Sequence, residues 1–322
     1  MKAMVQRRYG EPEVLELREI DRPSIRDDQV LVRVRAASIN PGDWATLRGE
    51  PFVARLASGL LAPRNPVGGM DLAGTVEAVG KNVTRLRPGD EVFGQGNGTF
   101  AEYAPALEKN LVHKPAGVTF EQAAAVPVAG MTALQAIRDV GAVKAGQQVL
   151  ITGAGGGIGT FAVQIAKALG AQVTGVCSTA KVELVRSLGA DRVIDYTRED
   201  FTRGGLRYDV ILDNAGKRTL AEARRALAAR GTLIPNNGQF EHRWLASLPT
   251  VLWASLLSLV VTQRLRPLLS LPDTARLLAL KDLLESGKVR PVVGKTYPLS
   301  DAGRAFAEFG QGHALGKLVL TV

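Results

Sequence analysis

A glycine-rich segment near the middle of the chain has the residue types and spacing of a site for nucleotide phosphates. Gly153, Gly156 and Gly159 follow the apolar run Gln148–Thr152 and precede an alanine-rich stretch of helical composition. Glycine permits a tight turn off a strand, close approach of a phosphate and close packing of the next helix, whose first N–H groups face the anion. We assign a dinucleotide pyrophosphate to the backbone of Gly153, Gly156, Gly157, Ile158 and Gly159.

The residues after the next apolar run bear on which dinucleotide is bound. NAD sites usually carry an Asp or Glu about 20 residues after the glycines, where it binds the ribose 2′-hydroxyl. This chain has Ser178, Thr179 and Lys181 there. Without that carboxylate nothing repels a 2′-phosphate, and hydroxyls with an ammonium can bind it. The pattern predicts NADPH; the alternative is that Lys181 is only a solvated residue in the first turn of a helix.

The alternation of strands and helices around these residues predicts a doubly wound parallel sheet in the middle of the chain. Short apolar strands alternate there with helices expected at 158–169 and 180–188, which is the pattern of a parallel α/β domain. The predicted strands are Gln148–Thr152, Gln172–Cys177, Arg192–Asp195, Val210–Asp213 and Thr232–Pro235.

The two ends of the chain have a different, β-rich texture. Gln29–Ala37 alternates in hydrophobicity and Gly74–Val79 is a β-branched run, while the tail ends in a predicted strand, Lys317–Val322. We therefore predict an α/β protein with a first domain at 1–122, a Rossmann domain at 123–265, and a return to the first domain at 266–322.

Composition limits the functions open to this chain. The 322 residues are 46% hydrophobic, and charges interrupt the N-terminal segment where a secretory signal needs an apolar run. A lone cysteine, Cys177, cannot form an intramolecular disulfide, so we expect a cytoplasmic protein. The net charge is +9, but the Lys and Arg residues are scattered, which predicts a solvated basic surface and no nucleic acid partner.

One uncharged stretch, Trp244–Gln263, approaches the length of a membrane span. Pro249 and five Ser or Thr residues interrupt it. We expect a buried strand and helix or an apolar subunit contact, and no membrane span.

A short-chain dehydrogenase is one interpretation of the glycine segment, since Asn214-Ala215-Gly216 also resembles that family. Two observations oppose it. Residues 1–147 precede the motif, whereas that family begins with it, and no Tyr in the chain is followed four residues later by a Lys.

The whole chain resembles instead the medium-chain dehydrogenase/reductase superfamily, in its zinc-independent quinone oxidoreductase branch, close to the reticulon-4-interacting-protein-like reductases. The resemblance implies a GroES-like β-rich catalytic domain beside the Rossmann domain, NADPH as cofactor, and a homodimer. The motifs that carry it, in order, are Ser38–Trp44, Gly68–Gly80, Arg87–Gly94, Ala129–Leu134 and Leu315–Val322.

Zinc is not expected. Zinc alcohol dehydrogenases of this superfamily carry a Cys in the first motif and Gly-His-Glu in the second, whereas this chain has Asn40 and Gly69-Met70-Asp71. Without a metal, a conjugated carbonyl accepts hydride more readily than an alcohol gives it up. We therefore expect reduction of a quinone or α,β-unsaturated carbonyl; the alternative is a non-catalytic NADPH-binding protein that regulates or binds another protein or RNA.

The resemblance also nominates four residues away from the glycine segment. It puts Asn40 beside the nicotinamide as hydrogen-bond donor to the substrate oxygen, Thr132 near the nicotinamide, Tyr196 on the adenine-ribose side and Lys317 near the cofactor. The alternatives are a turn amide for Asn40, a helix-cap hydroxyl for Thr132, a strand-end aromatic for Tyr196 and a surface charge for Lys317.

A tyrosine that donates the final proton follows the first-motif Asp in some relatives. Here Asp43 is followed by Trp44, Ala45 and Thr46. We expect the proton to come from water.

Overall fold

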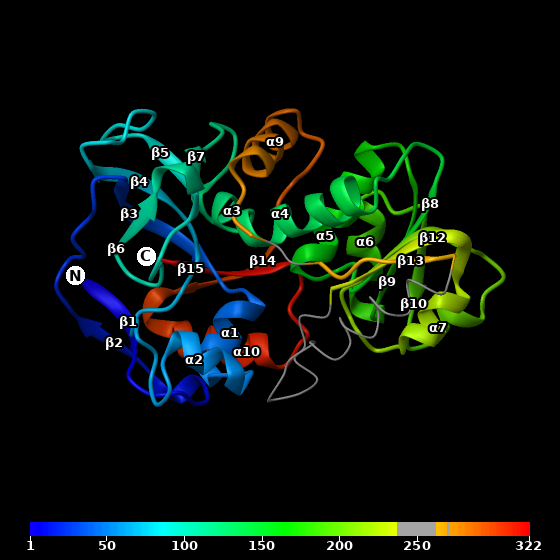
Figure 1. Ribbon diagram of the computed structural model, residues 1–322, viewed down its shortest axis with the longest axis horizontal. Coiled ribbons are helices and arrows are strands. Elements are labelled where there is room, and N and C mark those ends of the chain that lie inside the picture. Colours follow the sequence, from blue (N-terminus) through cyan, green and yellow to red (C-terminus); the bar gives the residue numbers. More distant parts are fainter. Residues whose placement is uncertain (237–261, 269–270) are drawn as a thin grey trace. The chain divides into compact units, whose positions relative to one another are not determined.

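The computed structural model describes residues 1–236, 262–268 and 271–322, which form two separately packed units (Figure 1). The first, here the β-rich unit, contains Met1–Met131, Pro272–Ser286 and Pro291–Val322. The second, the Rossmann unit, contains Thr132–Leu271 and Gly287–Arg290. Nearly all of the apolar stretch Trp244–Gln263 lies outside the described residues.

The β-rich unit is built around a mostly antiparallel sheet in the order β14-β15-β3-β4-β5-β7, with β6 also paired to β3. The alternation that predicted β3 places Val30, Val32 and Val34 in the core with Phe100 and Phe306. The strands are β3 (Gln29–Ser38), β4 (Asp71–Val79), β5 (Glu91–Gln95), β6 (Tyr103–Leu107), β7 (Leu111–His113), β14 (Val293–Pro298) and β15 (Lys317–Thr321), and a separate pair is formed by β1 (Lys2–Gln6) and β2 (Leu15–Glu19).

The strand register brings three distant segments of the β-rich unit together. Ser38, the last residue of β3, pairs with Asp71 at the start of β4 and with Val319 in β15. Lys317 begins β15. Side chains from three strands therefore meet at this end of β3.

Helices close the same end of β3. Helix α1 (Pro41–Arg48) has Asn40 as N-cap and a proline at its start, where a missing N–H costs nothing. The Trp44 ring stacks on Phe306 of α10, with ring centroids 6.5 Å apart. The remaining helices are α2 (Arg55–Ser58), α3 (Phe120–Ala124), α9 (Thr274–Glu285), α10 (Ala302–Gly310) and α4 (Pro127–Leu134), whose residues from Thr132 on belong to the Rossmann unit.

The Rossmann unit is a six-stranded parallel sheet in the order β10-β9-β8-β11-β12-β13. The chain runs outward from β8 through β9 and β10, then returns to β11 on the other side of β8, so the carboxyl ends of β8 and β11 form the switch point where such sheets bind ligands. The strands are β8 (Gln148–Thr152), β9 (Gln172–Cys177), β10 (Arg192–Asp195), β11 (Tyr208–Asp213), β12 (Leu227–Pro235) and β13 (Arg264–Leu265), and the helices are α5 (Gly157–Ala168), α6 (Val182–Ser187) and α7 (Leu220–Arg225).

In the part of the chain that the structure describes, no helix is both long enough and apolar enough to cross a bilayer.

Candidate active site

The glycine turn lies between β8 and α5 and is closed by its own backbone. Gly153 has φ of 63°, a left-handed conformation that glycine adopts without strain, and the Gly156 N–H donates to the Gly153 carbonyl at 2.9 Å. A Cβ on Gly159 would lie 2.1 Å from the same carbonyl oxygen. Glycine is therefore required at 153 for the turn and at 159 for the approach of α5.

Gly156 has a different environment, because it faces open space. The one atom near a Cβ built there is the Gly153 carbonyl oxygen, at 3.3 Å. Gly156 is also the N-cap of α5, and no side chain caps the helix. The first N–H groups of a 12-residue helix thus lie beside an open approach, an arrangement that fits a pyrophosphate.

The end of β11 fixes the turn from the side, a contact that the sequence analysis did not identify. The Thr152 hydroxyl donates to the Asp213 carboxylate at 2.6 Å, and the Asn214 amide donates to the Thr152 carbonyl at 3.1 Å. Asn236 in turn donates to the Asn214 amide oxygen at 2.8 Å. The available signal was Asn214-Ala215-Gly216 after a strand, which had been interpreted only as a likeness to another family.

Lys181 lies across the glycine turn. A Cβ on Gly155 would be 2.8 Å from Cδ and 2.9 Å from Cβ of Lys181, so the lysine stem covers this glycine. Burial of the side chain lowers the pKa of Lys181. The contact joins the predicted 2′-phosphate residues to the pyrophosphate turn within one unit.

Thr179 has a partner that the sequence analysis missed. Its hydroxyl donates to the Asp195 carboxylate at 2.6 Å, and Asp195 ends the neighbouring strand β10, where it pairs with Cys177 of β9. The residues just after β9 carry no carboxylate, as predicted, but the end of β10 brings one to the same place. Only the sequence just after β9 was considered, whereas the adjacent parallel strand ends at the same edge of the sheet.

Tyr196 lies at this edge too, directly after β10. Its backbone N–H donates to the Cys177 carbonyl at 3.1 Å, its side chain is 41% exposed, and the Lys217 ammonium lies 4.9 Å from the ring centroid. Part of the Tyr196 ring is therefore exposed at the carboxyl edge of the sheet, and an ammonium lies over the ring.

A buried polar cluster occupies the end of β3 in the β-rich unit. Asp71 accepts hydrogen bonds from the Ser38 hydroxyl at 3.0 Å, the Asn40 amide at 3.0 Å and the Val128 N–H at 3.1 Å. Lys317 donates to the Asn40 amide oxygen at 2.5 Å and lies 3.9 Å from Asp71. We call Ser38, Asn40, Asp43, Asp71 and Lys317 the polar cluster.

Burial sets the electrostatics of the polar cluster. Lys317 is 4% exposed, so the alternative of a surface charge was wrong for this residue. Burial, and then the charge of Asp71, raise the pKa of Asp43 to about 7. Burial also raises the pKa of Asp71, against the opposing effects of Lys317 and the hydrogen bonds, and it lowers the pKa of Lys317.

The Asn40 side chain is fully engaged within the cluster. Its Nδ2 donates to Asp71 and, at 3.3 Å, to the Ser38 carbonyl, while Oδ1 accepts from Lys317. The backbone N–H of Asn40 donates to Asp43 at 2.8 Å. The Asn40 amide therefore does more than satisfy the turn before Pro41, because it connects an anion to a cation.

The predicted site residues fall into two sets. Asn40 and Lys317 are in direct contact in the β-rich unit. Thr132, 4% exposed, is the first residue of the Rossmann unit and lies in α4. The residues at the glycine turn and at the ends of β9 and β10 form the second set: Gly153, Gly156, Gly157, Ile158, Gly159, Ser178, Thr179, Lys181 and Tyr196.

Comparison with known proteins agrees with this architecture. A family model for the alcohol dehydrogenase GroES-like domain matches residues 26–116, and one for zinc-binding dehydrogenase matches residues 188–320. The chain is 36% identical to a quinone oxidoreductase of Pseudomonas aeruginosa, with 97% of each covered. The chain belongs to the medium-chain dehydrogenase/reductase superfamily, in its zinc-independent quinone oxidoreductase branch.

Two further members of this branch extend the comparison. The chain is 35% identical to an NADPH-dependent alkenal/one oxidoreductase of Arabidopsis thaliana chloroplasts, over 99% of the chain and 79% of that protein. The structure of Escherichia coli quinone oxidoreductase complexed with NADPH superposes with a TM-score of 0.85 at 26% identity, covering 100% of both chains.

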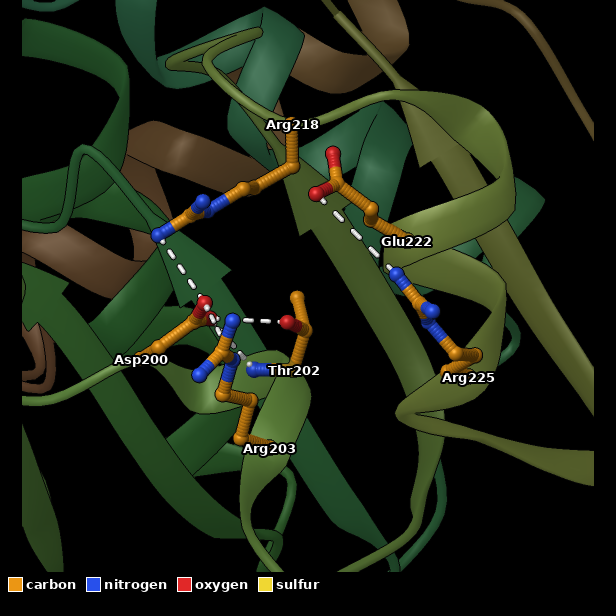
Figure 2. A pocket seen from close by; sticks show the side chains of 6 residues that line it. All are labelled: Asp200, Thr202, Arg203, Arg218, Glu222 and Arg225. Carbon is orange, nitrogen blue, oxygen red and sulfur yellow. Dashed lines mark hydrogen bonds and ion pairs between the residues drawn. The ribbon is translucent and has the colours of Figure 1, made fainter.

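Two other features of this quinone oxidoreductase-branch protein concern metal ions and charged ligands. Across the described residues, no group of His, Cys, Asp and Glu side chains has the arrangement of a metal site. A hollow in the Rossmann unit is lined by Arg203, Arg218 and Arg225, but Figure 2 shows Arg218 directed at Asp200 and Arg225 at Glu222, with N–O distances of 3.1 and 4.0 Å. Arg203 also lies 3.8 Å from Asp200. Each arginine that lines the hollow is therefore paired with an acidic residue that lines it too.

Proposed function

We propose that this protein is an NADPH-dependent, zinc-independent reductase that transfers hydride to a quinone or an α,β-unsaturated carbonyl compound. The observation that carries the proposal is the uncapped glycine turn with the Lys181 stem lying over Gly155. The names of relatives support it, since they include quinone and NADPH-dependent alkenal/one oxidoreductases.

The Rossmann unit supplies the groups that would hold the cofactor. The first N–H groups of α5, from Gly157, Ile158 and Gly159, are proposed to bind the pyrophosphate, and Gly153 and Gly156 keep its approach open. Ser178 and Lys181 are proposed to bind the 2′-phosphate, since a hydroxyl and an ammonium can make charge-assisted hydrogen bonds to it. Thr179 lies beside them, and Tyr196 offers an aromatic face to the adenine and its ribose.

Asn40, Lys317 and Thr132 are proposed for the nicotinamide end. When bound, NADPH supplies the hydride. Asn40 stabilises the oxygen that gains charge by donating a hydrogen bond to it. Asn40 Nδ2 makes two hydrogen bonds, one of 3.0 Å to Asp71 and a longer one of 3.3 Å to the Ser38 carbonyl. In this proposal Asn40 gives up the longer bond when the substrate oxygen binds. Lys317 and Asp71 hold the amide meanwhile, and water supplies the final proton.

The test is a turnover assay with a panel of acceptors. Purified protein is mixed with NADPH and with ortho-quinones, para-quinones or short enones, and the reduced nicotinamide is followed by its absorbance near ~340 nm. We expect oxidation of NADPH with at least one conjugated acceptor. Tight NADPH binding without turnover on any of them would support instead a non-catalytic NADPH-binding protein.

We also infer a cytoplasmic homodimer. Family resemblance supports the dimer, and a single cysteine, buried as Cys177, is consistent with a reducing compartment. Light scattering on the eluted protein tests the mass, and a monomer at working concentration would contradict the dimer.

A further inference from the structure

We propose that Asp195 limits how strongly this protein discriminates between NADPH and NADH, because it holds the Thr179 hydroxyl as a hydrogen-bond acceptor toward the ribose 2′ position. The proposal rests on the proposed function, which places the adenosine ribose at the end of β9. It assigns a specificity-determining role to a residue outside the predicted site.

The geometry at the edge of β9 and β10 defines this pair. Asp195 Oδ2 accepts from the Thr179 hydroxyl at 2.6 Å, and Asp195 Oδ1 accepts from the Thr197 N–H at 3.0 Å and from the Thr197 hydroxyl at 2.8 Å. Arg198 lies 3.7 Å from the carboxylate. Thr179 itself is exposed to solvent.

Counting hydrogens decides the direction of each bond. A threonine hydroxyl has one hydrogen and two lone pairs, and an ionised carboxylate has no hydrogen to give. The hydrogen bonds from Thr179 and Thr197 keep the pKa of Asp195 below its ordinary value, so the carboxylate is ionised at neutral pH. The Thr197 hydroxyl oxygen also lies 3.2 Å from the Thr179 hydroxyl, but both threonine hydroxyls donate to Asp195 at shorter distances. The single hydrogen of Thr179 therefore points at Asp195, and only lone pairs remain for a ligand.

The two cofactors respond oppositely to such an acceptor. The 2′-hydroxyl of NADH is a donor and can bond to the Thr179 oxygen, whereas a 2′-phosphate carries acceptor oxygens and a charge of about −1.5 to −2 at neutral pH. Lys181 favours the phosphate, while Thr179 and Asp195 favour the hydroxyl. The preference for NADPH is accordingly smaller than Lys181 alone would produce.

Asp195→Asn reverses the bond with little structural change. The amide oxygen still accepts from the Thr197 N–H, while the amide nitrogen now donates to Thr179 and leaves the threonine hydrogen available for a phosphate. The probes are 2′,5′-ADP and 5′-AMP, which differ only by the 2′-phosphate, titrated by calorimetry. We expect the ratio of their dissociation constants to shift about tenfold toward 2′,5′-ADP, as for one hydrogen bond to a charged group.

The same substitution in a Thr179→Val background separates the hydroxyl from the charge. We expect the shift caused by Asp195→Asn to fall to about threefold or less there, because only the loss of a partly solvated charge remains. An unchanged ratio in the wild-type background, or an equal shift in both backgrounds, would overturn the proposal. Failure of the wild-type protein to bind either probe would count against the proposed function instead.

Discussion

The glycine turn of the Rossmann unit and the polar cluster of the β-rich unit are built from opposite materials. The turn is made of backbone, from consecutive residues, and its functional groups are N–H dipoles beside open space. The cluster is made of charged and neutral polar side chains, from segments as far apart as Asn40 and Lys317, and it is buried. A bulky side chain at the turn should therefore weaken cofactor binding without lowering the stability of the protein. Loss of a charged side chain from the polar cluster should instead lower the free energy of unfolding.

Asp71→Ala tests the cluster and should have the largest effect. It removes the acceptor of three hydrogen bonds and the anion beside Lys317. An uncompensated buried charge typically costs about 3–5 kcal/mol. We expect the free energy of unfolding in urea to fall by that amount at neutral pH.

The matched control for that substitution is Asp28→Ala, at an exposed aspartate 3.6 Å from Arg26. Exposed pairs contribute about 0–1 kcal/mol. If the two alanine variants were equally stable, the polar cluster would have no special structural weight.

Gly156→Val tests the turn. The backbone at Gly156 is extended and the site is open, so folding should be little affected, while the branched side chain fills the approach to the pyrophosphate. We expect NADPH affinity to fall about 100-fold, or ~3 kcal/mol, with a thermal midpoint close to that of the wild type. Gly205→Val, at another open glycine, should leave binding intact; comparable losses in the two variants would contradict the assignment.

Asp43→Asn tests the charge state of the cluster. Because the pKa of Asp43 is raised from 3.8 to about 7 in the fold, protonation favours the folded state: this contribution is fully present below pH ~4 and is lost as the pH rises to ~7. The variant lacks this titration. We expect its stability relative to wild type to improve by more than about 1 kcal/mol between pH 4 and 8, measured by urea unfolding. A constant difference across that range would mean that Asp43 keeps an ordinary pKa.

Lys181→Met is the mildest test of the turn. Methionine keeps an unbranched stem over Gly155 and removes only the ammonium. We expect NADPH affinity to fall about tenfold and NADH affinity by less than about twofold, since a hydrogen bond to a charged group contributes roughly 1.5 kcal/mol. Lys144→Met, at an exposed lysine, is the control. Equal losses for both cofactors would remove Lys181 from the 2′-phosphate site.

The same contrast explains how far the sequence could predict this protein. Three predicted strands, Gln148–Thr152, Gln172–Cys177 and Arg192–Asp195, have the observed bounds. Each contains β-branched apolar residues and is bounded by turn residues. The helix expected at 180–188 is shorter, Val182–Ser187, since a single tight turn at Thr179–Lys181 precedes it. The bounds of these elements depend on residues that are adjacent in the sequence, so they can be predicted from the sequence.

Contacts between distant residues were beyond such patterns. Asn40 and Lys317 were nominated through family resemblance, but nothing local connects either of them to Asp71, which is 31 residues from Asn40. The Thr179–Asp195 hydrogen bond spans 16 residues and two strands. Only the pairing of parallel strands brings those side chains together, and a search for an acid directly after β9 missed it.

The placement of β15 has a consequence for how the chain folds. This strand lies between β14 and β3, and its Lys317 contacts a residue 277 positions earlier. Residues 132–271, which build most of the Rossmann unit, lie between the two in sequence. During synthesis the Rossmann unit can fold from continuous sequence, while the β-rich sheet stays open at β3 until β15 has emerged. Closure of so long a loop is slow, so the edge of β3 at Ala36–Ser38, where β15 pairs, stays open to other strands until then.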